Sequence, residues 1–184
     1  MPSGSCPDTL PKEARPKTGG RHTIPPVMGH TDGVYVRQHR AIRSEPDLLL
    51  LQVIGDVTES DVTALLSHEE RVRAEFGYSL VLVDAAQMDV LPPKVRKHVA
   101  TLFVTDPTYR GAVAIAGASF AVRTVMGFLI RATDLLSGKP TEPMRFFRTQ
   151  SESLAWLHAQ RSNQVRQRNL RLQTGRPIPD PPKF

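Results

Sequence analysis

One stretch in the second half of the chain constrains the fold more than any other. The apolar run 111–117 turns through Ala118 and Ser119 into a long apolar segment at Phe120–Ser137, and a short apolar run follows at 144–148. A strand followed directly by a helix and then by another strand is typical of α/β winding, in which helices cover a mostly parallel sheet. The sequence therefore predicts an α/β fold.

The rest of the chain extends this pattern. Hydrophobic periodicity and turn residues predict further strands over 34–39, 48–54 and 79–83, and further helices over 59–76, 94–104 and 151–160. Thr58 with Asp61 forms a short capping box, and Gly77 ends the first helix. We expect the order β, β, α, β, α, β, α, β, α in one domain, with the central apolar strands side by side in one sheet.

The positive charge lies near the two ends of the sequence. The chain of 184 residues has a net charge of +6, of which residues 1–31 carry +2, residues 161–184 carry +5 and residues 32–160 carry −1. Both end segments are rich in proline, which breaks helices and removes backbone donors. We therefore predict a disordered tail over 1–31, a domain over 32–160 and a basic tail over 161–184, the last a candidate for weak contact with phosphate or anionic lipid.

Composition restricts the class of protein further. Cys6 is the only cysteine, so the sequence supports no disulfide framework within the chain, and a reducing, cytoplasmic location is expected. Arg123, Arg131 and Asp134 interrupt the longest apolar helix, which argues against a membrane span. The basic segment has no interleaved aromatic residues, so we do not expect nucleic acid as a partner.

Several segments together resemble a known superfamily. These are the order of elements, Asp84 at the end of a hydrophobic strand, the junction Gly-Ala-Ser-Phe-Ala-Val-Arg at 117–123, and the segment 144–157 with its Arg-Phe-Phe. They resemble the STAS superfamily and, more narrowly, the bacterial SpoIIAA-like proteins of unknown function, over roughly residues 33–159. The resemblance implies a single-domain mixed β-sheet with helices packed on it, related in shape to the lipid-carrying CRAL-TRIO domains. It also implies a non-enzymatic binding or regulatory module that acts through protein contact.

The resemblance also raises the question of a phosphorylation switch. Anti-sigma-factor antagonists of this superfamily are switched at a serine in the loop after the third strand, and here Pro93 stands where that serine is expected. Proline has no hydroxyl group that could accept a phosphoryl group. The sequence therefore departs from the family at the switch.

The strand-to-helix turn is the predicted ligand-binding site. Gly117, Ser119, Phe120 and Arg123 surround a helix N-terminus, which with a nearby arginine suits a phosphate or carboxylate group. The same segment nearly spells a nucleophile elbow, so a serine hydrolase using Ser119 with Asp134 and His158 is an alternative. The simpler interpretation is that Ser119 caps the helix and that the chain has no catalytic residue.

The long apolar helix also predicts a partner surface. One arc of this helix is expected to cover the sheet, whereas Phe128 and Ile130 flank that arc and lie near Arg131. Such a surplus of apolar residues is typical of a subunit contact, including a homodimer, or of a groove for a lipid or other small apolar ligand. Packing against a neighbouring helix would also account for it.

Metal and cofactor sites have little support in the sequence. The six histidines are dispersed and lack the spacing of a metal motif, so we predict neither a metal nor a cofactor. Asp84 and Asp89 follow one strand closely, and paired carboxylates can serve acid and base chemistry. Turn and cap roles are the commoner use of aspartate at such a place, and we favour them.

Overall fold

The computed structural model describes residues 33–105, 111–137 and 143–174. Over these residues the strands are β1 Gly33–Val36, β2 His39–Glu45, β3 Leu48–Gly55, β4 Ser79–Met88, β5 Gly111–Ala116 and β6 Met144–Phe147. The helices are α1 Glu59–Phe76, α2 Pro93–Thr105, α3 Phe120–Ser137 and α4 Gln150–Thr174. Pro93 is the first residue of α2, where its missing N–H costs no hydrogen bond.

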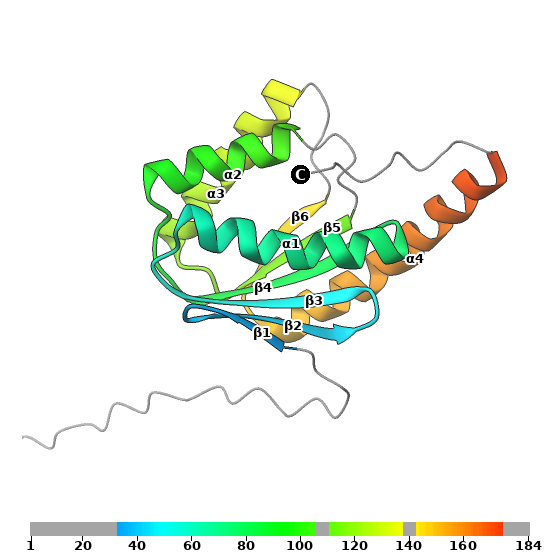
Figure 1. Cartoon of the computed structure of the whole chain (residues 1–184), viewed down its shortest axis with the longest axis horizontal. Coiled ribbons are helices and arrows are strands. Elements are labelled where there is room, and N and C mark those ends of the chain that lie inside the picture. Colours follow the sequence, from blue (N-terminus) through cyan, green and yellow to red (C-terminus); the bar gives the residue numbers. More distant parts are fainter. Residues whose placement is uncertain (1–32, 106–110, 138–142, 175–184) are drawn as a thin grey trace, which may run out of the picture.

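The six strands form one mixed sheet in sequence order (Figure 1). β1, β2 and β3 are antiparallel neighbours joined by short turns, whereas β3, β4, β5 and β6 are parallel and joined through helices. Parallel neighbours require a crossover, and the helices supply it. The predicted α/β fold, with the central apolar strands β3, β4 and β5 side by side, is confirmed.

The helices cover both faces of the sheet. α1, α2 and α3 lie over one face and α4 lies over the other (Figure 1). The alternation of side chains along β5 separates the two faces: Ala112 and Ala114 pack with Leu157 of α4, while Val113 and Ile115 pack with residues of α1 and α3. The small alanine side chains allow α4 to lie close to the sheet.

Local interactions fix both ends of α1 as predicted. The hydroxyl group of Thr58 accepts a hydrogen bond from the N–H of Asp61 at 3.2 Å, and the Asp61 carboxylate accepts one from the N–H of Thr58 at 2.9 Å. Gly77 has a φ of 76°, the left-handed conformation that favours glycine at a helix end.

The sheet contains one strand more than predicted. The predicted strand 34–39 in fact spans a turn at Arg37 and Gln38, after which β2 begins. Arg37 has a φ of 54° although it is not glycine, and its guanidinium donates a hydrogen bond to Asp61 at 2.8 Å. The side-chain amide of Gln38 donates to the carbonyl oxygen of Ile54 at 2.7 Å. Contacts with a distant segment stabilise this turn, which is why no local sequence signal marks it.

The boundary predicted after residue 160 is wrong, because α4 continues to Thr174. Arg161 forms ion pairs with Asp47 at 2.7 Å and Glu45 at 2.6 Å. The side-chain amide of the buried Gln164 donates to the carbonyl oxygen of Gly111 at 3.1 Å. Arg161 and Gln164 on α4 therefore belong to the folded domain. The predicted disorder of 1–31 and of 175–184 lies outside the described residues.

Candidate functional site

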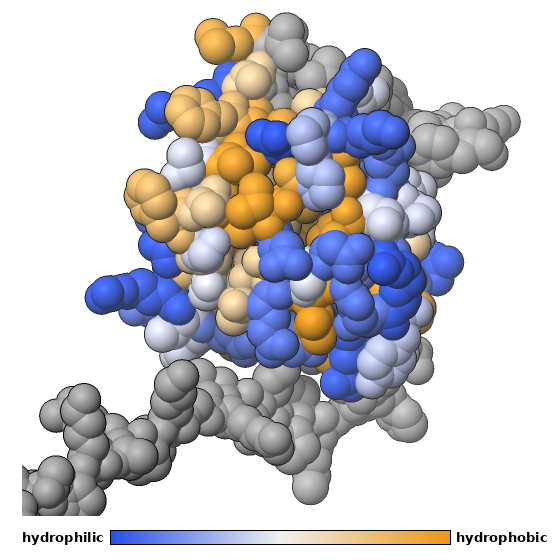
Figure 2. All heavy atoms as spheres, turned by 90° about the vertical axis from the view of Figure 1, so that its left-hand side faces the viewer, coloured by the Kyte–Doolittle hydropathy of each residue, from blue (hydrophilic) through white to orange (hydrophobic). Residues whose placement is uncertain are grey.

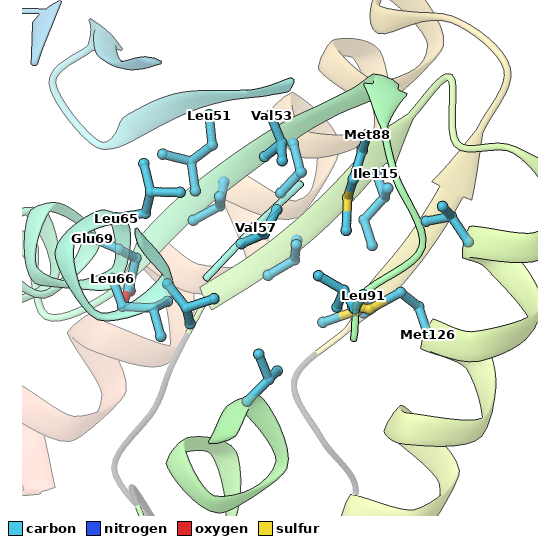
Figure 3. A pocket seen from close by; sticks show the side chains of 17 residues that line it. Leu51, Val53, Val57, Leu65, Leu66, Glu69, Met88, Leu91, Ile115 and Met126 are labelled. Carbon is cyan, nitrogen blue, oxygen red and sulfur yellow. The ribbon is translucent and has the colours of Figure 1, made fainter. Parts of the chain in front are cut away.

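An apolar cavity lies between the sheet and the helices α1, α2 and α3, which cover one of its faces (Figure 3). Its volume is about 140 Å³. The sheet lines it with Leu51, Val53, Val81, Val83, Met88, Val113, Ile115 and Met144, and the helices and loops with Val57, Val62, Leu65, Leu66, Glu69, Leu91, Val99, Val122 and Met126. Sixteen of these seventeen side chains are hydrophobic, so the site offers van der Waals contact and few polar partners.

The helix arrangement explains why space remains here. α2 packs mainly against α3 and α1 and makes few close contacts with the sheet, in contrast to α4 on the other face. Short β-branched side chains such as Val83 and Val113 therefore face a gap that no larger side chain of the described residues fills. Figure 2 shows hydrophobic side chains gathered over α2 and α3 on the face where the parallel strands end, above a polar region around the β1–β2 turn.

Glu69 is the one charged residue among those that line the cavity. It lies on the inner face of α1 and is only 2% exposed. Its carboxylate accepts a hydrogen bond from the hydroxyl group of Ser79, and the Nε of Arg73 lies 3.9 Å from its Oε1. The protein thus compensates this buried carboxylate with its own donors, and the rest of the lining stays apolar.

The four predicted ligand-binding residues lie on one turn between β5 and α3. The hydroxyl group of Ser119 accepts a hydrogen bond from the N–H of Val122 at 3.2 Å, so Ser119 caps α3. The Nε of Arg123 donates to the carbonyl oxygen of Ala118 at 2.9 Å, and Phe120 is exposed. Anion binding at this turn stays a prediction, with Ser119 and Arg123 both engaged in local hydrogen bonds.

Gly117 serves a close approach between two strands. Its φ is 70°, and a Cβ atom added to it would lie 2.9 Å from the Cβ of Ala86 on β4. Only glycine combines this conformation with this separation. Gly117 therefore brings the start of α3 close to the end of β4.

The structure does not bring together the residues of the hydrolase alternative. Ser119 precedes α3, on the face of the sheet opposite to α4, which carries His158. The Nε2 of His158 lies 2.9 Å from the carboxylate of Glu45, the last residue of β2, at the other end of the sheet. No Ser-His pair forms between these residues.

Asp84 holds two segments together. Its carboxylate accepts hydrogen bonds from the N–H of Ala86 at 3.1 Å and from the side-chain amide of Gln150 at 2.9 Å. Asp89 is exposed at the end of this segment. Asp84 lies within β4, because the strand predicted over 79–83 continues to Met88. Asp84 therefore does not follow the strand as predicted, and its side chain fixes the start of α4 from inside the sheet.

The predicted partner surface is partly exposed. Phe128 is 67% exposed and Arg131 is also exposed, whereas Ile130 is partly buried on the flank of α3. Val122, Met126 and Leu129 point to the opposite side, toward the cavity and α2. One helix thus has the cavity on its inner face and an apolar stripe on its outer face.

Sequence reasoning missed the cavity itself. The methionines are the residues that could have indicated it. Three of the five in the chain line the cavity although they are far apart in sequence: Met88, Met126 and Met144. Within residues 33–105, 111–137 and 143–174 no group of three or more His, Cys, Asp or Glu side chains is placed to hold a metal ion. Over the same residues no helix is long and apolar enough to cross a membrane.

Comparison with known proteins gives a likeness of fold. No family model and no curated protein matches the chain. A solved structure that matches is an uncharacterized protein of the DUF3478 family with a SpoIIAA-like fold, from Shewanella loihica PV-4. It is 18% identical, the match covers 69% of this chain and 91% of that chain, and the TM-score is 0.44.

Proposed function

We propose that this chain is a non-enzymatic binding module that holds a small apolar ligand between its sheet and α1, α2 and α3. The observation that carries the proposal is the cavity of about 140 Å³ with its apolar lining. An engineered cavity of about 150 Å³ lined by aliphatic and aromatic side chains stays dry and binds benzene or xenon. A compact apolar molecule, or the end of an acyl chain, fits a space of this size.

Energetics favour an apolar occupant over water or empty space. A buried water needs two to four polar partners, and the one charged group in the lining, Glu69, already accepts a hydrogen bond from Ser79 and pairs with the charge of Arg73. An empty cavity of this volume costs about 3 kcal/mol at roughly 24 cal/mol per Å³. That cost is a large fraction of the stability of an ordinary domain, and an apolar ligand that fills the cavity removes it.

The module is also proposed to act through protein contact, because α3 links two surfaces. Met126 of α3 lines the cavity, while Phe120, Phe128 and Leu135 on the outer side of the same helix are exposed. A ligand that contacts Met126 can therefore shift α3 and alter the outer contact. This arrangement suits a regulatory protein that responds to a small apolar molecule.

Calorimetric titration of the full chain with benzene and indole tests the ligand site. We expect binding, and a higher melting temperature in the presence of the ligand. Val99→Phe fills the cavity from α2 and should abolish binding. Val165→Phe makes the same chemical change at an exposed position of α4 and should bind as the natural chain does. Absence of binding to the natural chain, or equal binding by the Val99→Phe variant, would contradict the proposal.

A second experiment addresses the natural ligand. Native mass spectrometry of the protein purified from its own cells should show a retained molecule of low polarity, and the Val99→Phe variant purified in the same way should lack it. A natural chain that carries no such molecule would count against the ligand site.

A further inference from the structure

The outer side of α3 forms a continuous stripe. At 100° per residue, Phe120, Thr124, Phe128, Arg131 and Leu135 fall within an arc of about 80°, opposite to the arc that faces the cavity. Phe120 is 86% exposed, Phe128 67% and Leu135 85%. We call these five residues the outer stripe.

Gly127 lies beside the outer stripe near the middle of α3. The surrounding structure does not require a glycine at this position. A Cβ atom added to Gly127 would meet nothing within 4 Å, and α3 is helical there. Glycine in a helix interior is about 1 kcal/mol less favourable than alanine. A contact with another molecule at Gly127 would explain why glycine stands there. Arg123, Thr124, Gly127, Phe128 and Arg131 line a depression of about 210 Å³ at this point.

We propose that the outer stripe binds a second copy of this chain, with the two α3 helices antiparallel; this rests on the protein contact proposed above and names its partner. The positions are self-complementary about a two-fold axis between Gly127 and Phe128. An antiparallel pair places Phe120 opposite Leu135, and Thr124 opposite Arg131. It also places the Phe128 ring of each copy over Gly127 of the other. In a two-fold contact each residue pair occurs twice, and this stripe meets that condition along its length.

The area agrees with a dimer of moderate affinity. Two phenylalanines and one leucine exposed to this extent present roughly 450 Å² of side chain per chain. Two copies supply roughly 900 Å² from these residues, and Thr124, Gly127 and Arg131 between them bring the total to the ~1,000 Å² expected of a specific interface. The two Arg131 side chains start about 10 Å apart along the helix axis, which exceeds the Debye length of about 8 Å at physiological salt. Salt therefore screens most of the repulsion between these two positive charges.

Sedimentation equilibrium of the full chain tests the dimer. We expect twice the mass of one chain at concentrations above a Kd in roughly the micromolar range. Phe128→Glu should weaken dimerisation roughly a hundredfold, because the symmetric contact loses a buried ring twice and gains two facing charges. Tyr35→Glu changes an aromatic residue of equal exposure, 68%, on β1 and should leave the dimer intact. A monomer at all concentrations, or a dimer indifferent to Phe128→Glu, would overturn the proposal.

The variant Gly127→Leu distinguishes an effect on dimerisation from an effect on folding. It improves helix propensity, so the melting temperature should stay the same or rise. It also fills the depression that receives Phe128 of the second copy, so the dimer should be lost. A variant that melts like the natural chain and still dimerises would overturn the packing at Gly127.

Disulfide cross-linking tests the antiparallel arrangement, with Cys6→Ser as background. Chains with Phe120→Cys and chains with Leu135→Cys should cross-link when mixed and oxidised. Neither should cross-link alone, because identical positions at the ends lie about 22 Å apart along the axis. Cross-linking of either variant with itself, or none in the mixture, would overturn the arrangement. None of these outcomes affects the titration of the cavity with Val99→Phe, so the two proposals can fail separately.

Discussion

Replacement of Arg161 by alanine tests whether α4 packs on the folded domain beyond residue 160. The guanidinium of Arg161 donates two hydrogen bonds to Asp47, at 2.9 Å and 2.7 Å, and one to Glu45 at 2.6 Å. Asp47 is buried and also accepts a hydrogen bond of 2.6 Å from the hydroxyl group of Tyr78. Burial and this bond raise the pKa of Tyr78 to about 12. Burial acts to raise the pKa of Asp47, but the bonds from Arg161 and Tyr78 outweigh it and lower the pKa.

Without Arg161 the buried Asp47 carboxylate loses its cation. Breaking a fully buried ion pair costs about 3–5 kcal/mol, and partial access of water to Arg161 reduces this here to about 2 kcal/mol. Adding Asp47→Asn to the alanine variant should restore part of the loss, because the uncompensated charge is removed while Tyr78 keeps an acceptor.

Urea unfolding followed by the fluorescence of Trp156 measures this effect. Trp156 is the only tryptophan and lies on α4, with its ring centroid 5.6 Å from that of Phe147. His158→Ala is the control, since His158 pairs with Glu45 at the surface and should contribute less than about 0.5 kcal/mol. If Arg161→Ala unfolds within about 0.5 kcal/mol of the natural chain, the residues after 160 do not stabilise the domain as inferred.

Further substitutions test the local structure. Gly117→Ala should cost about 3 kcal/mol, because the new Cβ meets Ala86 at 2.9 Å, whereas Gly77→Ala, with a similar φ and open space, should cost about 1 kcal/mol in the same urea assay. Ser119→Ala should cost about 1 kcal/mol through loss of the cap, and an unchanged stability would contradict the capping role. Burial acts to raise the pKa of Asp61, but hydrogen bonds from Thr58 and Arg37 lower it to about 2 from 3.8. The unfolded chain therefore binds the proton first, and stability present above pH 3.8 is lost as the pH falls toward 2. Acid titrations of unfolding should differ between the natural chain and Asp61→Asn by about 2 kcal/mol in this window, and parallel curves would contradict the assignment.

The parts of the fold that depend on local pattern could be predicted from the sequence. The capping box at Thr58, the ending of α1 at Gly77 and the cap at Ser119 each involve residues three or four apart or a single glycine conformation. The strand-to-helix junction before Phe120 could be predicted because the hydrophobic period changes there.

The parts that depend on distant partners could not be predicted. The turn at Arg37 is held by Asp61, and Arg161 is held by Asp47, which is 114 residues away in sequence. The cavity depends on how far α2 and α3 stand from the sheet, and no periodicity encodes that distance. The wide apolar arc of α3 predicts a subunit contact or a ligand groove, and this stays a prediction. The cavity lies on one side of this helix and the exposed Phe128 on the other.

Titration of the full chain with indole, followed by NMR of ¹³C-labelled methionine methyl groups, tests the ligand site most directly. Met88, Met126 and Met144 line the cavity. We predict that these three methyl signals shift together and saturate, and that Val99→Phe abolishes the shifts. Stationary signals of these three methionines in the natural chain, or equal shifts in the Val99→Phe variant, would contradict an apolar ligand site in this cavity.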